Sequence, residues 1–362
     1  MRNLQRCLRL GYVASLLLLA GCSAPQTTIE PRSDFAGDIH SVYVIVFWLG
    51  MAVFVAILAL TVGIGFWYRE REGRVAKQIH GNTKLEVFWT LVPVVLVAAI
   101  LVPTWQVVAE SSGPAPDDAL HIDAVGRQWW FEFRYDLDGD GSSDDLVTAN
   151  ELHVPAGRAV SISLYSGDVI HSFWVPQLAG KVDMVPGHEN DLWFTPDADA
   201  ARAEPYLGQC AEFCGTAHAD MRFRVFVDTP EDFAAWVERE TGDGAAPASA
   251  EAQAGQELFL KRIWAVADGP AVLGCATCHT VSGTDARAVV GPNLTHVGSR
   301  STIAAGLIEN DLDNLVAWIS NPHRIKPGVD SFDDAARFMP AFERVLTPGQ
   351  IRAIAAYLLE LR

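Results

Sequence analysis

The chain has 362 residues, enough for two or three domains, and half of them are hydrophobic. Its formal net charge of −17 argues against nucleic acid as a partner, because phosphate binding requires a basic face. The same acidity would let a basic protein dock by electrostatic steering, although it would equally keep an exposed domain soluble. The apolar excess lies in the first 110 residues, which indicates a membrane part followed by soluble parts.

Residues 1–21 have the pattern of a secretory leader, with a basic beginning and an apolar run that ends near Leu19. The following Leu-Ala-Gly-Cys is typical of a bacterial lipoprotein processing site and predicts lipidation of Cys22. The alternative is an anchor helix that is not cleaved. In either case, residues 22–40 would form a short N-terminal segment on the outer face of the membrane.

Residues 41–110 are predicted to form a transmembrane helical hairpin, with apolar spans at 41–68 and 84–108. The short loop between the spans is basic, so the positive-inside rule places it in the cytoplasm and the C-terminal part outside. Glu86 is an ionisable residue at the start of the second span. It could be solvated at the helix end, but an intramembrane carboxylate is also a functional candidate.

Between residues 115 and 230 the sequence changes to short alternating runs separated by Pro and Gly, which predicts a small antiparallel β-sandwich. The stretch that begins at Asp136 resembles the start of a calcium loop. Val147 stands at its twelfth position, where a bidentate Glu is needed, so we favour a solvated hairpin loop. The expected strands are 121–125, 129–134, 159–164, 192–195 and 222–227.

Residues 241–252 are mostly small and predict a flexible linker to an α-helical domain at 253–362. Helical periodicity extends over 252–263, 312–320 and 347–361, and Pro348 suits the first turn of the last helix. A linker of this length gives an effective concentration of about millimolar between the two domains. No tight docking face between them is therefore required.

Soft metal-ligating residues are densest at 209–221, where two cysteines, a histidine and a methionine follow one another at spacings of four, four and three. Thiolate, thioether and imidazole are the ligands that copper prefers, and two cysteines in a short turn can bridge a pair of ions. The alternative without a metal is a pair of buried or disulfide-bonded cysteines with an unrelated histidine. We predict a two-copper electron-transfer centre with bridging thiolates, two imidazoles, a weak thioether ligand and a backbone carbonyl, supplied by Cys210, Cys214, His171, His218, Met221 and Glu212.

Cys275-Ala-Thr-Cys278-His279 is a C-x-x-C-H motif, which predicts two thioether links to a haem and an axial histidine. Zinc and a redox disulfide fit less well, because a second ligand pair and a βαβ setting are missing. Met339 is the best candidate for the second axial ligand, although it could instead be a core residue, and the carbonyl of Pro292 could orient the His279 ring. With these assignments no cysteine is left for a structural disulfide.

From the membrane hairpin to residue 227 the sequence resembles subunit II of haem–copper cytochrome c oxidases, and the tail from about residue 253 resembles a class I cytochrome c. Gly255 and Tyr357 suit the crossing of the first and last helices of that second fold. Together they resemble the oxidase form whose subunit II carries a fused cytochrome c. The matching motifs are Gly81-Asn82, Leu85-Glu86 with Trp89-Thr90, Gln128-Trp129-Trp130, 168–176, 183–187 and the whole copper loop.

The resemblance implies a cupredoxin-like Greek-key sandwich on a two-helix anchor, with the binuclear copper A centre where electrons enter. Trp129 matches the aromatic residue through which an external cytochrome c delivers electrons. The Glu212 side chain matches a contributor to a magnesium site shared with subunit I, and Glu86 matches a carboxylate near a proton pathway into subunit I. At Arg127 and His188 the chain departs from the usual His and Arg, so inherited contacts to the haem propionates of subunit I are less secure.

The expected function is that of an oxidase subunit II in a bacterial inner membrane, with the copper and haem domains on the periplasmic face. Electrons would pass from a cytochrome c or similar donor to the covalent haem c, to copper A and to the haem of subunit I. Oxygen reduction and proton translocation would take place in that partner, and subunit III is a further expected partner. The alternatives are a quinol oxidase subunit, which would lack copper, and a stand-alone membrane-anchored carrier that serves another reductase.

Overall fold

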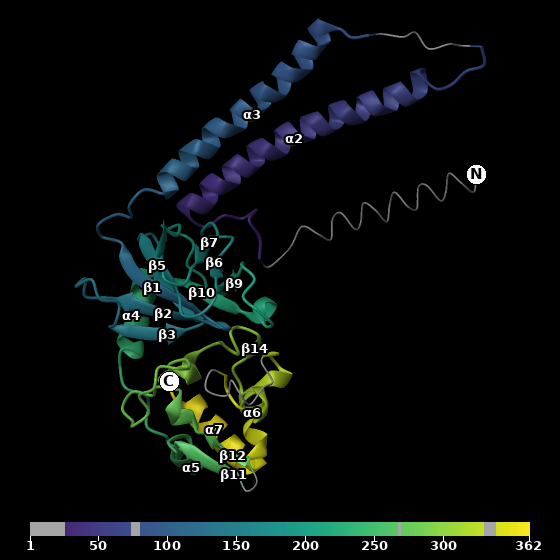
Figure 1. The fold of residues 1–362 in the computed structure, drawn as a ribbon. Helices are drawn as coiled ribbons and strands as arrows, with labels where there is room; N and C mark the ends of the chain where they lie inside the picture. The colour runs from purple at the N-terminus through teal and green to yellow at the C-terminus, as the bar shows by residue number, and fades with distance from the viewer. Residues whose placement is uncertain (1–25, 74–79, 267–268, 329–337) are drawn as a thin grey trace, which may run out of the picture. The chain divides into compact units, whose positions relative to one another are not determined.

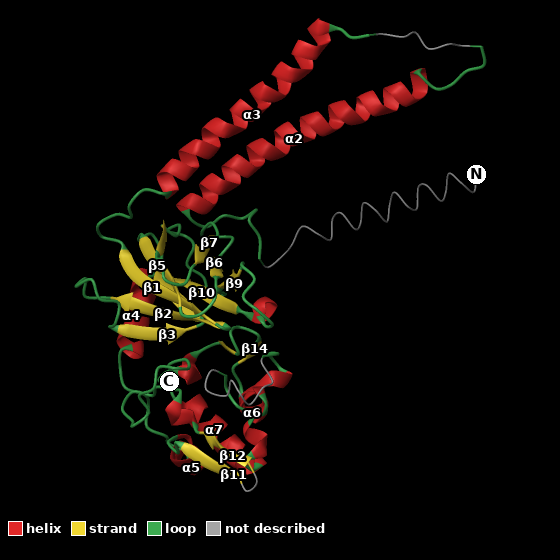
Figure 2. Ribbon diagram, in the orientation of Figure 1, coloured by secondary structure: helices red, strands yellow, loops and turns green. Residues whose placement is uncertain are grey.

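The computed structural model describes residues 26–73, 80–266, 269–328 and 338–362, so the predicted leader and Cys22 lie outside the described residues. Its two compact units are Asp34–Pro114 and a second unit that contains Ala115–Arg362. Figures 1 and 2 show the helices and strands of each unit. The second unit holds a β domain (120–240) and a helical domain (249–362).

Two long helices, α2 (Asp34–Trp67) and α3 (Thr83–Ser111), make up the first unit, and both are long and apolar enough to cross a membrane. Their apolar side chains are largely exposed, as lipid-facing side chains would be. Helix α2 begins seven residues before the predicted span, inside the expected outer segment. Glu86 lies in the first turn of α3, where its Oε1 accepts a 3.3 Å hydrogen bond from the backbone N–H of Asn82. The side chain of Asn82 in turn accepts from Leu85, so Glu86 helps to cap the helix.

The β domain is a sandwich of two five-stranded sheets, with strand orders β3-β2-β1-β5-β8 and β4-β10-β9-β6-β7. The predicted sandwich is confirmed and most of its strand pairs are antiparallel, but β1 pairs with β5, and β10 with β4, in parallel. The strands are β1 (Leu120–Arg127), β2 (Trp130–Asp136), β3 (Leu146–Ala149), β4 (Glu151–Pro155), β5 (Val160–Ser166), β6 (His171–Trp174), β7 (Val182–Met184), β8 (Asn190–Phe194), β9 (Tyr206–Cys210) and β10 (Arg222–Asp228).

Aromatic side chains fill the space between the two sheets. Phe223 lies at the centre, with its ring centroid 4.6 Å from that of Phe131 and 4.8 Å from that of Phe173. A Cβ on Gly208 would lie 2.3 Å from the Phe223 ring, so only glycine fits at this strand position without moving that ring. This core supports the adjacent ends of β6, β9 and β10.

The segment 241–248 leads into the helical domain, and an additional helix, α4 (Pro230–Glu240), precedes it. The linker is shorter than the predicted 241–252, because α5 already begins at Ala250. The backbone N–H of Ala248 also donates a 2.6 Å hydrogen bond to the Glu360 carboxylate. The remaining elements are α5 (Ala250–Phe259), α6 (Leu312–Ser320), α7 (Pro348–Glu360) and two short strand pairs, β11 (Ile263–Val266) with β12 (Gly269–Leu273), and β13 (Thr302–Ile303) with β14 (Ile308–Glu309).

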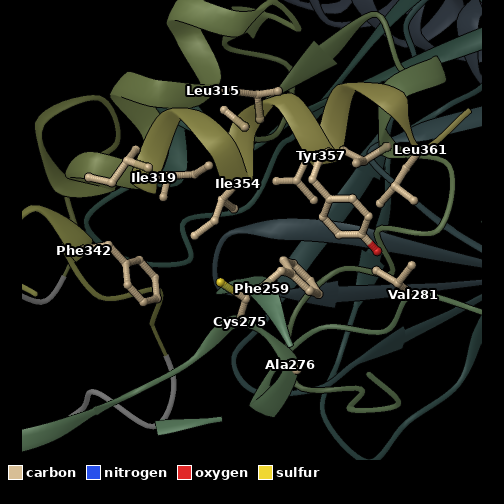
Figure 3. Close-up of a cluster of buried hydrophobic side chains, with 14 of the residues drawn as sticks. Phe259, Cys275, Ala276, Val281, Leu315, Ile319, Phe342, Ile354, Tyr357 and Leu361 are labelled. Carbon is tan, nitrogen blue, oxygen red and sulfur yellow. The ribbon is translucent and has the colours of Figure 1, made fainter. Parts of the chain in front are cut away.

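The core of the helical domain lies beneath the C-x-x-C-H motif. Figure 3 shows Cys275 beside Phe259, with Ile354 and Tyr357 of α7 and Leu315 of α6 completing the cluster. The rings of Phe259 and Tyr357 meet edge to face with centroids 5.6 Å apart, where α5 and α7 cross. The predicted place of Tyr357 at this crossing is confirmed.

Candidate functional site

The residues predicted to bind copper are brought together by the ends of three neighbouring strands. His171 begins β6, Cys210 ends β9, and Met221 directly precedes β10. β9 pairs with both other strands, and the N–H of Cys210 donates a 2.9 Å hydrogen bond to the carbonyl of Met221. The paired strands therefore fix His171, Cys210 and Met221, and they anchor both ends of the 211–220 loop that carries Glu212, Cys214 and His218.

The donor atoms of this cluster are close neighbours around the two thiol sulfurs. The two thiol sulfurs are 3.7 Å apart, and each has an imidazole Nδ1 nearby: His171 lies 3.9 Å from Cys210, and His218 lies 3.6 Å from Cys214. The Met221 Sδ lies 3.8 Å from the Cys214 Sγ. Soft sulfur and imidazole donors at these separations fit a thiolate-bridged copper pair.

The contact between the two thiols favours a thiolate at Cys210, and the same contact raises the pKa of Cys214. Contact with Cys214 lowers the pKa of Cys210, and hydrogen bonds to His171 and to nearby backbone groups act in the same direction, although burial opposes them. Cys210, Cys214, Cys275 and Cys278 are free thiols in this structure. A deprotonated sulfur is the form that binds metal.

Glu212 presents two different groups. Its backbone carbonyl lies 3.2 Å from the Cys210 Sγ, which places it within the cluster. Its carboxylate is partly exposed and lies 3.8 Å from the Nζ of Lys181, which also pairs with Asp183 at 2.7 Å. The backbone and the side chain of this residue therefore face different surroundings.

Asp168 is a site residue for which the sequence predicts no role of its own. Its Oδ1 lies 2.8 Å from Nε2 of His171, and its Oδ2 accepts a 2.7 Å hydrogen bond from the N–H of Gln128. The carboxylate therefore fixes the His171 ring with Nδ1 directed at the sulfurs. The signals in the sequence are its place three residues before the histidine and at the start of the matching motif 168–176.

We expect Asp168→Asn to lower copper affinity by about 10- to 100-fold, because a histidine ligand loses the carboxylate that orients it. Competition with a copper chelator would measure this change in the assembled protein. Asp144→Asn is the matched control, since Asp144 lies exposed in the β2–β3 hairpin. Equal copper retention in both variants would contradict the role of Asp168.

Trp129 is a buried aromatic residue that contacts the backbone of the copper cluster. It is only 6% exposed, and its Nε1 donates a 2.9 Å hydrogen bond to the carbonyl of Cys214. Gln128 donates to the same carbonyl at 2.8 Å. A side chain that must meet an external protein would be open to solvent, whereas this indole is covered.

A second site lies in the helical domain, where Cys275, Cys278, His279 and Met339 line one cavity. Nδ1 of His279 lies 2.8 Å from the carbonyl of Pro292, which confirms the expected contact. Burial lowers the pKa of His279, so the ring stays neutral and Nε2 can act as a ligand. These residues fit a covalently attached haem.

The predicted hairpin loop after β2 brings three carboxylates together, those of Asp136, Asp138 and Asp145. The backbone N–H groups of Gly139 and Gly141 donate to Asp136, and those of Leu137 and Asp138 donate to Asp145. These hydrogen bonds give the carboxylates a local structural role in an exposed turn.

Three family models match the chain in succession. They are "Cytochrome C oxidase subunit II, transmembrane domain" over residues 31–107, "Cytochrome C oxidase subunit II, periplasmic domain" over 120–227, and "Cytochrome c" over 252–362. The chain is therefore anchored by two transmembrane helices and carries a periplasmic domain. The second match implies a copper A site, and the third implies a covalent haem c.

Two relatives and one solved structure resemble the chain. Cytochrome c oxidase subunit 2 of Alkalihalophilus pseudofirmus is 32% identical and the alignment covers 96% of this chain and 94% of that protein. The Bacillus subtilis protein of the same name is 30% identical, with 86% and 87% covered. The periplasmic domain of subunit II of cytochrome oxidase of Bradyrhizobium japonicum is 30% identical, with 34% of this chain and 95% of that chain covered and a TM-score of 0.30. The chain belongs to the subunit II family of cytochrome c oxidase, in the form with a C-terminal cytochrome c domain, and works in electron transfer within a haem–copper oxidase complex.

Proposed function

We propose that electrons enter this chain at a haem c and leave through a binuclear copper A centre toward the haem of subunit I. That partner would reduce oxygen to water and translocate protons. The observation that carries the proposal is the grouping of both thiol sulfurs, two imidazole Nδ1 atoms and one thioether sulfur. Neighbouring donor atoms in this group are 3.6 to 3.9 Å apart. A rigid ligand set of this kind keeps reorganisation small and favours electron transfer.

We assign the copper ligands to His171, Cys210, Cys214, His218, Met221 and the carbonyl of Glu212, and the haem ligands to His279 and Met339, with thioether links at Cys275 and Cys278. The exposed Glu212 carboxylate is the proposed contributor to a magnesium site shared with subunit I. The capping position of Glu86 at the start of α3 is compatible with a place near a proton pathway. The proposed location is a bacterial inner membrane with both domains on its periplasmic face.

The alternative is a stand-alone membrane carrier that serves another reductase. Purification of the intact membrane complex separates the two functions, because the oxidase subunit must co-purify with a haem–copper subunit I. Absorption and paramagnetic-resonance spectra of the same complex should show a haem c and a mixed-valence copper pair. A chain that carries both cofactors but purifies without a haem–copper subunit would refute the oxidase proposal.

A further inference from the structure

The β13–β14 hairpin (301–309) is called here the docking hairpin. Its turn has three successive residues with positive φ angles. Ala304, Ala305 and Gly306 have φ angles of 57°, 62° and 77°. The left-handed region is unfavourable for residues that carry a Cβ, so two successive alanines there require support from their surroundings. Such conformations persist where neighbouring groups fix them.

Each of the three successive carbonyls of this turn accepts a hydrogen bond. The Ala304 carbonyl accepts from Nζ of Lys326 at 3.4 Å. The Ala305 carbonyl accepts from the backbone N–H of Arg222 at 3.2 Å, and the Gly306 carbonyl accepts from Nη2 of Arg224 at 2.9 Å. Arg222 and Arg224 belong to β10, the strand that directly follows Met221, so the turn is attached to an element that holds the copper site.

Glu151 fixes the other end of the docking hairpin. It lies in β4 and is 5% exposed. Its Oε1 accepts three hydrogen bonds, from the N–H of Ser301 at 2.9 Å, from the Ser301 hydroxyl at 2.6 Å and from the N–H of Thr302 at 3.2 Å. A buried carboxylate is costly unless its oxygens are hydrogen-bonded, so these contacts favour one arrangement of the two domains.

Lys326 connects the docking hairpin to Trp129. The lysine is 9% exposed, and its Nζ donates to the carbonyl of Trp129 as well as to that of Ala304. Phe338 stacks on the Trp129 indole with ring centroids 5.4 Å apart and an interplanar angle of 19°. Trp129 also lines the cavity that contains His279, so one indole forms a wall of the haem pocket and donates to a copper-site carbonyl.

We propose that the docking hairpin, with Glu151 and Lys326 as positioning residues, fixes the helical domain on the β domain and closes Trp129 to external electron donors. The proposal rests on the proposed function, because it concerns the path between the two cofactors. An external donor would then meet the helical domain, and electrons would pass to the copper site across the covered Trp129. A flexible tether alone would not need these contacts.

Hydrogen exchange of the intact complex tests the docking without relying on activity. Glu151→Ala removes the acceptor of three donors, so the amides of residues 301–306 should exchange faster, as should those around Trp129. Glu309→Ala, an exposed position on the same hairpin, should leave exchange unchanged. Unchanged protection of 301–306 in Glu151→Ala would overturn the docking role.

Photoreduction of haem c in the same complex then measures the transfer rate to copper. Glu151→Ala and Lys326→Met should slow it by about tenfold or more and make it depend on solvent viscosity, because the geometry is no longer held. Arg324→Met, which removes an exposed positive charge paired with Glu343, should match the unaltered rate. Glu151→Gln, which keeps an acceptor, should be intermediate.

The outcomes separate the two proposals. No transfer in the unaltered complex with both cofactors present would refute the proposed function. If electrons pass from haem c to copper at the same rate in the unaltered complex, in Glu151→Ala and in Lys326→Met, the docking proposal is overturned. The proposed function would then still stand. Slower, viscosity-dependent transfer in both variants, with faster hydrogen exchange in Glu151→Ala, would support it.

Discussion

A Cys214→Ser variant is expected to lose the mixed-valence two-copper signal and to reduce oxygen no faster than membranes without this chain. The reason is the central place of the Cys214 Sγ, which lies 3.7 Å from the Cys210 Sγ, 3.6 Å from Nδ1 of His218 and 3.8 Å from the Met221 Sδ. A serine hydroxyl is a hard donor that stays protonated at neutral pH, so it cannot replace a bridging thiolate. Paramagnetic resonance and oxygen uptake measure the two effects.

The matched control replaces a cysteine of the C-x-x-C-H motif in place of one in the copper cluster. Cys275→Ser should keep the copper signal and lose one covalent haem link, since Cys275 lies in the core of the helical domain beneath the haem pocket. In Cys214→Ser the haem spectrum should in turn remain. A Cys214→Ser protein that retains the mixed-valence signal would refute the bridging assignment.

Local sequence signals predict the elements whose ends are set by caps. Residues 312–320 are predicted as a helix, and α6 has these bounds, because the side chain of Asp311 accepts from the N–H of Asn314 at its start. At the last helix, Thr347 and Gln350 form a capping box in front of α7. The strands β3, β4, β6, β7 and β9 have three to five residues and are not predicted, because such short runs carry little alternation; of the strands this short in the β domain, β8 alone is predicted, and only in part.

The copper ligands could be predicted because most lie within one short segment, where residue type and spacing carry the chemistry. Contacts that depend on tertiary structure could not. Glu151 lies 150 residues from Ser301, and the partners of the docking turn are backbone carbonyls, which leave no mark in the sequence. Lys326 would be expected on the surface, yet folding buries it against the carbonyl of Trp129.

The second large effect concerns the crossing of α5 and α7. Gly255 faces α7 so closely that a Cβ would lie 1.9 Å from the carbonyl oxygen of Ala353 and 3.0 Å from the N of Ile354. Backbone atoms of a packed helix cannot yield as a flexible side chain can, so the two helices would have to separate. That separation would open the contact between Phe259 and Tyr357, which supports the core beneath Cys275 (Figure 3).

We therefore expect Gly255→Ala to destabilise the helical domain by about 3 kcal/mol, and Gly255→Val by more, because overpacking outweighs the gain in helix propensity. Guanidinium unfolding followed by the haem c absorption spectrum measures the change. Gly349→Ala is the control, since a Cβ at that position in α7 meets nothing within 4 Å. Alanine is the better helix former, so the control should be neutral or slightly stabilising. If both alanine variants unfold at the same denaturant concentration as the parent, the close approach at Gly255 does not limit the packing of the two helices.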